Sequence, residues 1–389
     1  MKKTKICFVS LDAGNLLTQE KPTKTHGIAA KQLTLAIALT NLGYNISFII
    51  YDHKDLKASI NKDINLIKAY NVNSGIPILR YFYPRLMKLW KSLKNAKADL
   101  YIQEGASHIT GITAYFCKKY RKSFIYCISN EKDVNGNYIK GKVFNNQIGK
   151  INNIRLKYRD GIIYKFGLER ANAIISQNVS QKRQLKANHK LDSLIIKTGQ
   201  IITPVKEYNN GDKIIWVGNL RDIKCPHLYL DLVKKIPDAE FQMIGGPASN
   251  SQKLYDEVLN RSKSIENLEF VGYVPYNKIH RYYEEALILV NTSQSEGGPI
   301  IFQEAWIRNI PVVSLNVDPD EAIYRKELGF HSKTFENMVK QVRILLKDDE
   351  LRRTMGRNGR KYVEKNHDIN KVVNKYVDLF NSLKNNNCE

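Results

Sequence analysis

Short apolar runs alternate with segments of helical spacing along most of the chain. Near the N-terminus two apolar runs, at residues 5–10 and 46–51, enclose a segment of helical periodicity at 28–42, which Gly43 ends. This order predicts a βαβ unit with parallel strands. The other elements expected in the first half are strands at 99–102 and 124–128, a helix at 111–120 between them, an irregular stretch at 129–160, and a segment at 162–170 that leads to a strand at 173–176.

The pattern pauses around residues 199–208, where Pro204 and then Asn209, Asn210 and Gly211 interrupt it. A second series follows, with strands at 213–217, 240–244, 268–271, 287–291 and 311–315 and helices at 227–235, 252–262, 276–285 and 299–308. Such alternation is typical of doubly wound parallel sheets. The sequence therefore predicts an α/β chain of two Rossmann-like, doubly wound domains that meet near residue 205, followed by helices over 335–383.

Length and composition indicate a globular protein of two domains. At 389 residues, with 43% hydrophobic and 25% charged side chains, the chain exceeds the size at which one core usually splits into two. Its 5 cysteines lie far apart, which predicts the reduced thiols of a cytoplasmic protein rather than a zinc ribbon or a disulfide framework. The first apolar run stops at Asp12, too early for a signal peptide, and no run reaches the ~18 apolar residues of a membrane span.

Positive charge is concentrated in the first half of the chain. The net charge is +23, and residues 1–200 hold 34 Lys and Arg against 12 Asp and Glu, whereas residues 201–389 hold 27 against 26. A compositional bias of the genome should affect both halves alike. The asymmetry therefore favours an anionic partner for the first half, such as phospholipid headgroups, a lipid diphosphate or nucleic acid, although the compositional explanation stays open.

The segment 295–306 carries the most informative chemistry. It follows a predicted strand, and ligands of open α/β sheets bind outside the carboxyl ends of the strands. Gly297 and Gly298 precede a helix that Pro299 is suited to start. Two glycines at this position let a phosphate approach free backbone N–H groups at the positive end of the helix dipole.

Two carboxylates belong to the same segment, Glu296 in the loop and Glu304 on the predicted helix. Carboxylate oxygens accept hydrogen bonds in pairs, which suits the vicinal hydroxyls of a sugar or a ribose. A capped helix with solvated glutamates is the competing interpretation.

These residues resemble the signature of an enzyme family. The spacing Glu296-x7-Glu304, followed by Ala305 and by the run 311–313, is similar to the motif of family-4 retaining glycosyltransferases of the GT-B fold. Other segments that resemble this family are 216–224, 234–238 and 270–272 in the second half, and His26-Gly27 and 42–44 in the first. The resemblance implies two domains that face a central cleft. Residues 1–205 would bind the acceptor, residues 206–368 the nucleotide-sugar donor, and a helix at 369–389 would pack back on the N-terminal domain.

The resemblance also implies roles for individual residues. Glu296 would hold hydroxyls of the donor sugar, Glu304 the ribose hydroxyls of a nucleotide of the UDP type, and Lys224 would neutralise the leaving diphosphate. The positions that it assigns to nucleotide-sugar binding are Gly27, Gly218, Asn219, Gly297, Gly298, Pro299, Ile300, Ile301 and Glu304. The donor is a substrate, and no cofactor is implied.

The chain departs from the family pattern beside Lys224. The arginine usually found five residues earlier is Asn219, so Arg221 on the same loop is the cation expected to reach the phosphates instead. The glycine that normally follows the lysine is Cys225, which we expect to be structural.

A second departure lies in the N-terminal domain. Many relatives have a histidine after the strand that corresponds to 124–128, and this chain has Asn130 and Asp133 there. Two interpretations stay open: contact with the transferred sugar, and solvation of the loop. Glu104 and His108 follow the neighbouring strand and are candidates for the lining of the acceptor cleft.

We expect no metal. Asp318-Pro319-Asp320 superficially resembles the metal-binding Asp-x-Asp of the other glycosyltransferase fold, but it follows a strand of the GT-B type. Lys224 and a helix dipole would stabilise the negative charge of the diphosphate in place of a metal.

Residues 80–97 combine aromatic and leucine side chains with Arg85, Lys88, Lys91, Lys94 and Lys97. A basic amphipathic helix of this kind fits an anionic membrane surface, and it equally fits ordinary packing on a core. The first interpretation predicts a peripheral protein on the cytoplasmic face of the cell membrane, bound through its N-terminal domain.

The leading hypothesis is a retaining, metal-independent, hexosyltransferase-like enzyme that builds a cell-surface polysaccharide or a lipid-linked oligosaccharide of the bacterial cell envelope. A nucleotide-sugar epimerase on the same scaffold is an alternative, because a fold does not fix a function. A basic nucleic-acid-binding protein is the alternative from another class. It is disfavoured because the sequence has no zinc-finger spacing, RNP-like motif or heptad basic region, so we expect no nucleic-acid partner.

Overall fold

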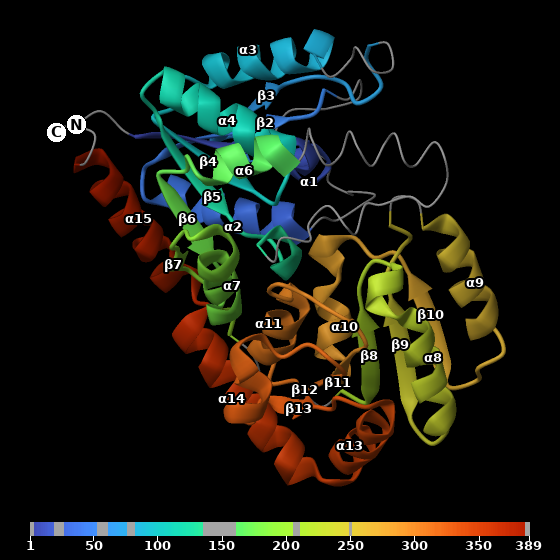
Figure 1. The fold of residues 1–389 in the computed structure, drawn as a ribbon. Coiled ribbons are helices and arrows are strands. Elements are labelled where there is room, and N and C mark those ends of the chain that lie inside the picture. The colour runs from blue at the N-terminus through green and yellow to red at the C-terminus, as the bar shows by residue number, and fades with distance from the viewer. Residues whose placement is uncertain are drawn as a thin grey trace. The chain divides into compact units, whose positions relative to one another are not determined.

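The computed structural model describes residues 4–18, 27–52, 61–75, 82–134, 161–204, 211–248 and 251–385. The chain forms two compact units, one of Met1–Gly199 together with Ile369–Glu389 and one of Gln200–Asp368. Each unit is built on one sheet with helices on both faces (Figure 1). The division after Gly199 lies a few residues before the position expected from the sequence, and the terminal helix belongs to the first unit.

The first unit has a parallel sheet of 7 strands among the described residues, in the order β3-β2-β1-β4-β5-β6-β7. The strands are β1 (Lys5–Val9), β2 (Asn45–Ile50), β3 (Ile64–Lys68), β4 (Leu100–Glu104), β5 (Ser123–Cys127), β6 (Ala173–Ser176) and β7 (Leu194–Ile195). Phe8 of β1 lies opposite Phe48 of β2 and Ile102 of β4, and all three are buried. Because helices cover both faces, the central strands are continuous apolar runs.

Helices pack on both faces of this sheet (Figure 1). The helical segments are η1 (Leu11–Ala13), α1 (Gly14–Thr18), α2 (Gly27–Asn41), η3 (Phe82–Leu86), α3 (Met87–Ala96), α4 (His108–Lys119), η4 (Glu131–Asp133), α6 (Ile163–Leu168), α7 (Val179–His189) and α15 (Ile369–Asn385). Residues of α3, α4 and α6 share a core with Cys7, Tyr101 and Phe124. Helices α2 and α15 contact each other on the opposite face, where Phe8 and Ile102 point.

Helices α4 and α6 cross closely because glycines lie at their contact. A Cβ on Gly111 of α4 would lie only 2.2 Å from the carbonyl oxygen of Ile163. A Cβ on Gly167 of α6 would lie 2.6 Å from the backbone nitrogen of Gly111. This crossing fixes the position of α4, whose first residues border the cavity described below.

The second unit has a parallel sheet of 6 strands in its described part, in the order β10-β9-β8-β11-β12-β13. The strands are β8 (Lys213–Val217), β9 (Glu240–Ile244), β10 (Leu268–Gly272), β11 (Ala286–Asn291), β12 (Val312–Ser314) and β13 (Gly329–His331). The helical segments are η7 (Asp222–Lys224), α8 (Pro226–Lys235), α9 (Gln252–Ser262), η8 (Tyr276–Lys278), α10 (His280–Glu284), α11 (Ile300–Ile307), η9 (Pro319–Glu321), α12 (Ala322–Arg325), α13 (Phe335–Lys347) and α14 (Asp349–Asn366).

Alternate residues of β8 serve two separate cores in this unit. Trp216 packs with side chains of α8, α9 and α13 on one face of the sheet. Ile215 packs on the other face with Phe302 of α11 and with side chains of α10 and α12. This alternation confirms the predicted doubly wound architecture.

Several elements were missed by the sequence prediction. Strand β3 is partly exposed along most of its length, and β7 and β13 have only 2 and 3 residues, too few to show a period. Helix α7 buries only Gln181 and Leu185, so it has no apolar stripe. The basic helix expected over 80–97 is α-helical only at Met87–Ala96. Residues 80 and 81, His26 and most of the stretch expected to be irregular, from 135 to 160, lie outside the described residues.

Candidate functional site

Two loops meet at the carboxyl edge of the second sheet. Strand β8 pairs in parallel with β11, so the segments that follow both strands leave the sheet at the same edge. The backbone N–H of Gln294 donates to the carbonyl oxygen of Ile223 over 2.8 Å, which joins the two loops directly. Lys224 and Glu296, 72 residues apart in sequence, are thereby brought into contact.

A buried hydroxyl fixes the backbone at Lys224. The indole N–H of Trp216 donates to Oγ1 of Thr292 over 3.0 Å, and this hydroxyl donates to the carbonyl oxygen of Lys224 over 2.7 Å. Trp216 and Thr292 are both buried, where a polar group without a partner costs about 1–3 kcal/mol. One threonine therefore ties the loop after β8 to the end of β11.

Lys224 and Glu296 form an ion pair at this edge. Nζ of Lys224 lies 2.6 Å from Oε1 of Glu296, and the two side chains are 19% and 14% exposed. The same oxygen also accepts hydrogen bonds from Asn291 and Ser293. Oε2 of Glu296 has no hydrogen-bond partner among the described residues. Because an ammonium group has three donors, Lys224 can keep this contact and still donate to an anion.

Helix α11 begins four residues after Glu296. Pro299 is its N-cap and Ile300 its first helical residue, so the proline lies one position earlier than expected. The backbone N–H groups of Ile300 and Ile301 have no acceptor in the described part of the chain, as is usual in the first turn of a helix. With Gly297 and Gly298 directly before Pro299, this end of α11 is suited to bind an anion.

Glu304 is buried on the second turn of α11. Burial raises the pKa of its carboxyl above the ordinary value, while the hydroxyl of Tyr283, the charge of Arg308 and the hydroxyl of Tyr276 act in the opposite direction. The carboxylate is therefore surrounded by two tyrosine side chains and an arginine. Such a carboxylate suits the adjacent hydroxyls of a ribose.

The loop after β8 also carries the other predicted residues. Arg221 precedes η7, and its exposed side chain has no partner among the described residues. Gly218 and the half-exposed Asn219 directly follow the strand. A Cβ on Gly245, after β9, would lie 1.8 Å from the carbonyl oxygen of Gly218. The close contact between these two loops therefore requires a residue without a side chain at position 245.

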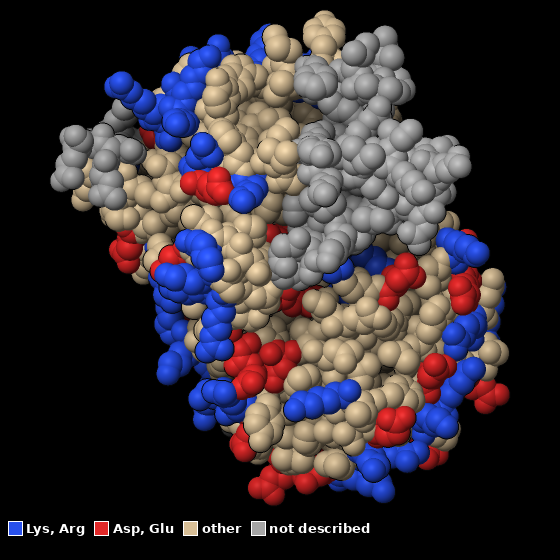
Figure 2. Space-filling model, viewed as in Figure 1, with Lys and Arg blue, Asp and Glu red and all other residues tan. Residues whose placement is uncertain are grey.

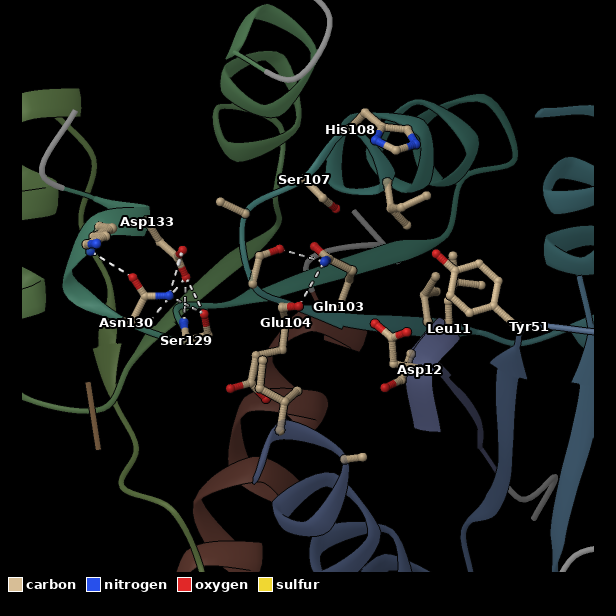
Figure 3. Close-up of a pocket in the computed structure, with 18 residues that line it drawn as sticks. Leu11, Asp12, Tyr51, Gln103, Glu104, Ser107, His108, Ser129, Asn130 and Asp133 are labelled. Atoms are coloured by element: carbon tan, nitrogen blue, oxygen red, sulfur yellow. Dashed lines mark hydrogen bonds between the residues drawn. The ribbon is translucent and has the colours of Figure 1, made fainter. Parts of the chain in front are cut away.

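The first unit has a cavity of about 510 Å³ at the carboxyl edge of its own sheet (Figure 3). Its walls come from the segments that follow β1, β2, β4 and β5. The polar side chains that line it are Ser10, Asp12, Tyr51, Gln103, Glu104, Ser107, His108, Ser129, Asn130, Lys132 and Asp133. The predicted residues Asn130, Asp133, Glu104 and His108 are thus brought together around one space.

Asp133 and Asn130 belong to a hydrogen-bonded loop after β5. Oδ2 of Asp133 accepts from the backbone N–H and the hydroxyl of Ser129, over 2.8 Å and 2.7 Å, and Oδ1 accepts from Nδ2 of Asn130 over 3.2 Å (Figure 3). Burial raises the pKa of Asp133, and these hydrogen bonds act against that rise. Both oxygens of the carboxylate are therefore used by the loop itself.

Two other carboxylates of the cavity differ in their surroundings. Glu104 is buried and forms an ion pair with Lys31 of α2; burial raises its pKa, and the charge of Lys31 lowers it. Asp12 is exposed and lies across the cavity from Asn130 and Asp133 (Figure 3). It has no hydrogen-bond partner among the described residues, so its oxygens are available to a ligand.

The structure also places Gly27 and the Asp318 segment. Gly27 is the exposed first residue of α2. The carboxylate of Asp318 accepts hydrogen bonds from the backbone N–H groups of Ile323 and Tyr324 over 2.8 Å and 3.2 Å. Both of its oxygens are therefore used by the first turn of α12 rather than by a ligand. Within the described ranges, no group of three or more His, Cys, Asp and Glu side chains is arranged to hold a metal ion.

The sequence interpretation missed the residues that hold the ion pair in place. Asn291, Thr292 and Ser293 are buried at the end of β11, and each makes a side-chain hydrogen bond to Lys224 or Glu296. The sequence signal that could have indicated them is the run of three polar residues that begins at the last position of the apolar strand β11.

Comparison with known proteins finds similarity mainly in the second unit. Residues 199–362 match the family described as glycosyl transferases group 1. An uncharacterized glycosyltransferase of Haemophilus influenzae is 28% identical over 153 residues, which are 38% of this chain and 42% of that protein. An uncharacterized glycosyltransferase of Methanocaldococcus jannaschii is 26% identical over 222 residues, 55% of this chain and 60% of that protein. The matches thus span about half the length of these curated relatives.

Solved structures resemble the whole chain. A sucrose-phosphate synthase from Thermosynechococcus elongatus superposes with a TM-score of 0.74 at 16% identity and covers 98% of this chain and 99% of its own. Anabaena HepE, solved in complex with UDP and glucose, gives a TM-score of 0.70 at 13% identity, with 97% and 100% covered. The fold is that of the GT-B glycosyltransferases, as predicted. The match to the glycosyl transferases group 1 is confined to residues 199–362, and the family-4 assignment stays a prediction.

Proposed function

We propose that this chain is a retaining, hexosyltransferase-like glycosyltransferase that moves a sugar from a nucleotide sugar of the UDP type to a cell-surface polysaccharide or a lipid-linked oligosaccharide. The observation that carries the proposal is the ion pair between Lys224, after β8, and Glu296, shortly before α11, both inside the segment that matches the glycosyl transferases group 1. This edge of the sheet offers donors for a diphosphate and a carboxylate for sugar hydroxyls. Glu304, on the same helix, offers a second carboxylate for ribose hydroxyls.

The solved neighbours support a donor of the UDP type. Anabaena HepE has been solved with UDP-glucose and with UDP, and a TarM variant of S. aureus has been solved with UDP, fondaparinux and alpha-GlcNAc-glycerol. These ligands were found in those proteins. We take UDP-sugars as the first candidates for the donor of this chain.

The proposed reaction exchanges one glycosidic bond for another. The bond between C1 of the sugar and the diphosphate oxygen breaks, and its electron pair leaves with the diphosphate. The acceptor hydroxyl forms the new bond to C1 on the same face, and its proton passes to the departing phosphate oxygen. Lys224, with Arg221 on the same loop, stabilises the negative charge that develops on the diphosphate. Glu296 orients the sugar through its hydroxyls.

No metal is part of this proposal. Lys224, Arg221 and the backbone N–H groups at Ile300 and Ile301 supply positive charge to the diphosphate. In metal-dependent transferases a bound cation has that role.

The cavity of the first unit is the proposed acceptor site. Lys132 is the single lysine among its described lining residues, and it stands against three carboxylates, those of Asp12, Glu104 and Asp133. This favours an uncharged, hydroxylated group inside the cavity, such as the end of a glycan, over a phosphate. Asp12 is the carboxylate that would accept a hydrogen bond from the acceptor hydroxyl.

Part of the positive charge of the first unit lies on the outer helices α3 and α4. We define the α3–α4 surface by the exposed Lys88, Lys91, Lys94, Lys118 and Lys119 together with Met87, Trp90, Tyr115 and Tyr120. Nζ of Lys94 lies 5.6 Å from the ring centre of Tyr120, and Nζ of Lys119 lies 5.9 Å from that of Trp90. Figure 2 shows lysine and arginine side chains gathered at the upper left, over these helices. Cations beside aromatic rings that are at least partly exposed fit an anionic lipid surface.

The proposed location is accordingly peripheral, at the cytoplasmic face of the cell membrane. None of the helices in the described ranges has the length and apolar character that crossing a bilayer requires. The contact would be made by the α3–α4 surface, with phospholipid headgroups or the diphosphate of a lipid-linked acceptor as its anionic partner, and no nucleic acid is part of the proposal.

Nucleotide binding tests the assignment of the two glutamates. We expect UDP and at least one UDP-sugar to bind the full chain, and Glu304→Gln to weaken UDP by roughly 10- to 100-fold, because a hydrogen bond to a charged group is lost. Glu296→Gln should leave UDP affinity nearly unchanged and impair turnover of the UDP-sugar. Isothermal titration measures the affinities, and Glu350→Gln on the exposed start of α14 is the matched control. No binding of any nucleotide sugar, or equal behaviour of all three variants, contradicts the proposal.

Loss of the cation should slow the reaction without a metal being involved. We expect Lys224→Ala to lower the rate of UDP release from the donor by about 100-fold or more, because the leaving diphosphate loses its main stabiliser. Arg221→Ala should give a smaller loss, and Lys234→Ala at the exposed end of α8 should give none. EDTA should not change the rate of the unaltered enzyme. Activity that disappears in EDTA and returns with Mg²⁺ or Mn²⁺ would show that the mechanism needs a metal.

Vesicle binding tests the α3–α4 surface. We expect the full chain to sediment with vesicles that contain phosphatidylglycerol but not with pure phosphatidylcholine, and binding to weaken as salt is raised. Replacing Lys88, Lys91 and Lys94 by Glu should reduce the affinity at least about 100-fold, since each lysine near an anionic surface contributes about 1 kcal/mol. The same change at Lys234, Lys326 and Lys340, exposed in the second unit, is the control. Equal binding to both kinds of vesicle, or to neither, refutes the proposed membrane contact.

A further inference from the structure

Three donors converge on a single oxygen of Glu296. Oε1 accepts from Nζ of Lys224 over 2.6 Å, from Oγ of Ser293 over 2.8 Å and from Nδ2 of Asn291 over 3.0 Å. The other oxygen, Oε2, has no partner among the described residues, and the side chain is 14% exposed. The carboxylate is therefore held in one orientation by one oxygen, and the second oxygen is available to a ligand.

The amide of Asn291 has its orientation set from the opposite side. Its Oδ1 accepts the backbone N–H of Ser293 over 3.2 Å and the hydroxyl of Ser314 over 3.4 Å. A backbone N–H can only donate, so the oxygen of the amide must face Ser293 and its NH₂ group must face Glu296. Asn291 is 2% exposed, so this amide is shielded from solvent.

These bonds connect the ends of three adjacent strands. The hydroxyl of Ser314, at the end of β12, accepts the backbone N–H of Val317 and donates to Asn291 at the end of β11. Asn291 then donates to Glu296, which contacts Lys224 after β8. The position of the carboxylate thus follows from the register of the sheet rather than from its own loop alone.

We propose that Asn291 is a positioning residue for the donor sugar. Together with Ser293 it holds Oε1 of Glu296 against Lys224, so that Oε2 is presented to a hydroxyl of the sugar when a nucleotide sugar is bound. The inference rests on the proposed function. It adds that selection of the sugar, as distinct from the nucleotide, depends on a buried amide that itself touches no substrate.

The experiment separates the sugar from the nucleotide. Dissociation constants of UDP, UDP-glucose, UDP-galactose and UDP-N-acetylglucosamine are measured with the full chain by calorimetry, and the UDP-sugar that binds the unaltered chain most tightly is the probe. We expect Asn291→Ala to weaken this probe by about 10-fold or more, because a charged hydrogen bond is lost, and to change UDP affinity by less than about twofold. Ser293→Ala, which removes one hydroxyl, should give the same selective loss to a smaller degree.

A double variant tests whether Asn291 acts through Glu296. If it does, Asn291→Ala combined with Glu296→Gln binds the probe no more weakly than Glu296→Gln alone, because the effects of residues that act as one unit do not add. Gln242→Ala removes another buried amide from the same sheet, one that donates to Glu269 over 2.7 Å. It should lower thermal stability without changing either affinity, so it controls for a general loss of structure.

Two results overturn the positioning role. The first is that Asn291→Ala and Ser293→Ala weaken UDP and the UDP-sugar by the same factor. The second is that the double variant weakens the UDP-sugar by the product of the factors measured for Asn291→Ala and Glu296→Gln separately. An unaltered chain that binds neither UDP nor any of the UDP-sugars contradicts the proposed function itself, and the inference fails with it.

Discussion

The parallel pairing of β8 with β11 is the constraint on which the proposed donor site depends. It brings the loops after these two strands to one edge of the sheet, where Lys224 and Glu296 form an ion pair over 2.6 Å although 72 residues separate them. The pair is not held by charge alone. The hydroxyl of Thr292 holds the backbone of Lys224, and Asn291 holds the carboxylate. Binding of a diphosphate beside a carboxylate requires both groups to be fixed in advance, because a mobile pair would neutralise itself rather than bind a ligand.

The first unit also has a polar cavity at the carboxyl edge of its sheet. Its cavity contains carboxylates in three environments: Asp133 within a hydrogen-bonded loop, Glu104 buried against Lys31, and Asp12 exposed to the cavity. The first-half excess of positive charge is therefore not carried by the cavity wall. Five lysines of this half lie on the α3–α4 surface, where Lys94 and Lys119 lie beside the rings of Tyr120 and Trp90. On the proposed function, an uncharged glycan end and an anionic surface would contact separate parts of the same unit.

Much of the fold followed from the sequence because buried parallel strands are continuous apolar runs. The strands β6, β8 and β9 have the bounds that the pattern predicted. Glu296 and Glu304 also stood out, since their spacing around a glycine pair is a local signal. The hydrogen bonds of Asn291 and Thr292 could not be predicted in the same way, because they depend on the register between strands that are distant in sequence. The carboxylate of Asp133, for which contact with a sugar and solvation of the loop were equally open, is used by its own loop, a result that needs the backbone positions of Ser129 and Asn130.

A crystal structure of the full chain with bound UDP tests the central claim most directly. The account predicts density for the diphosphate at the first turn of α11, within hydrogen-bond distance of Lys224 and of the backbone N–H groups of Ile300 or Ile301, and a ribose whose hydroxyls contact Glu304. It also predicts that Oε1 of Glu296 keeps its contacts with Asn291 and Ser293. UDP bound elsewhere on the chain, with this edge of the second sheet unoccupied, would contradict the account.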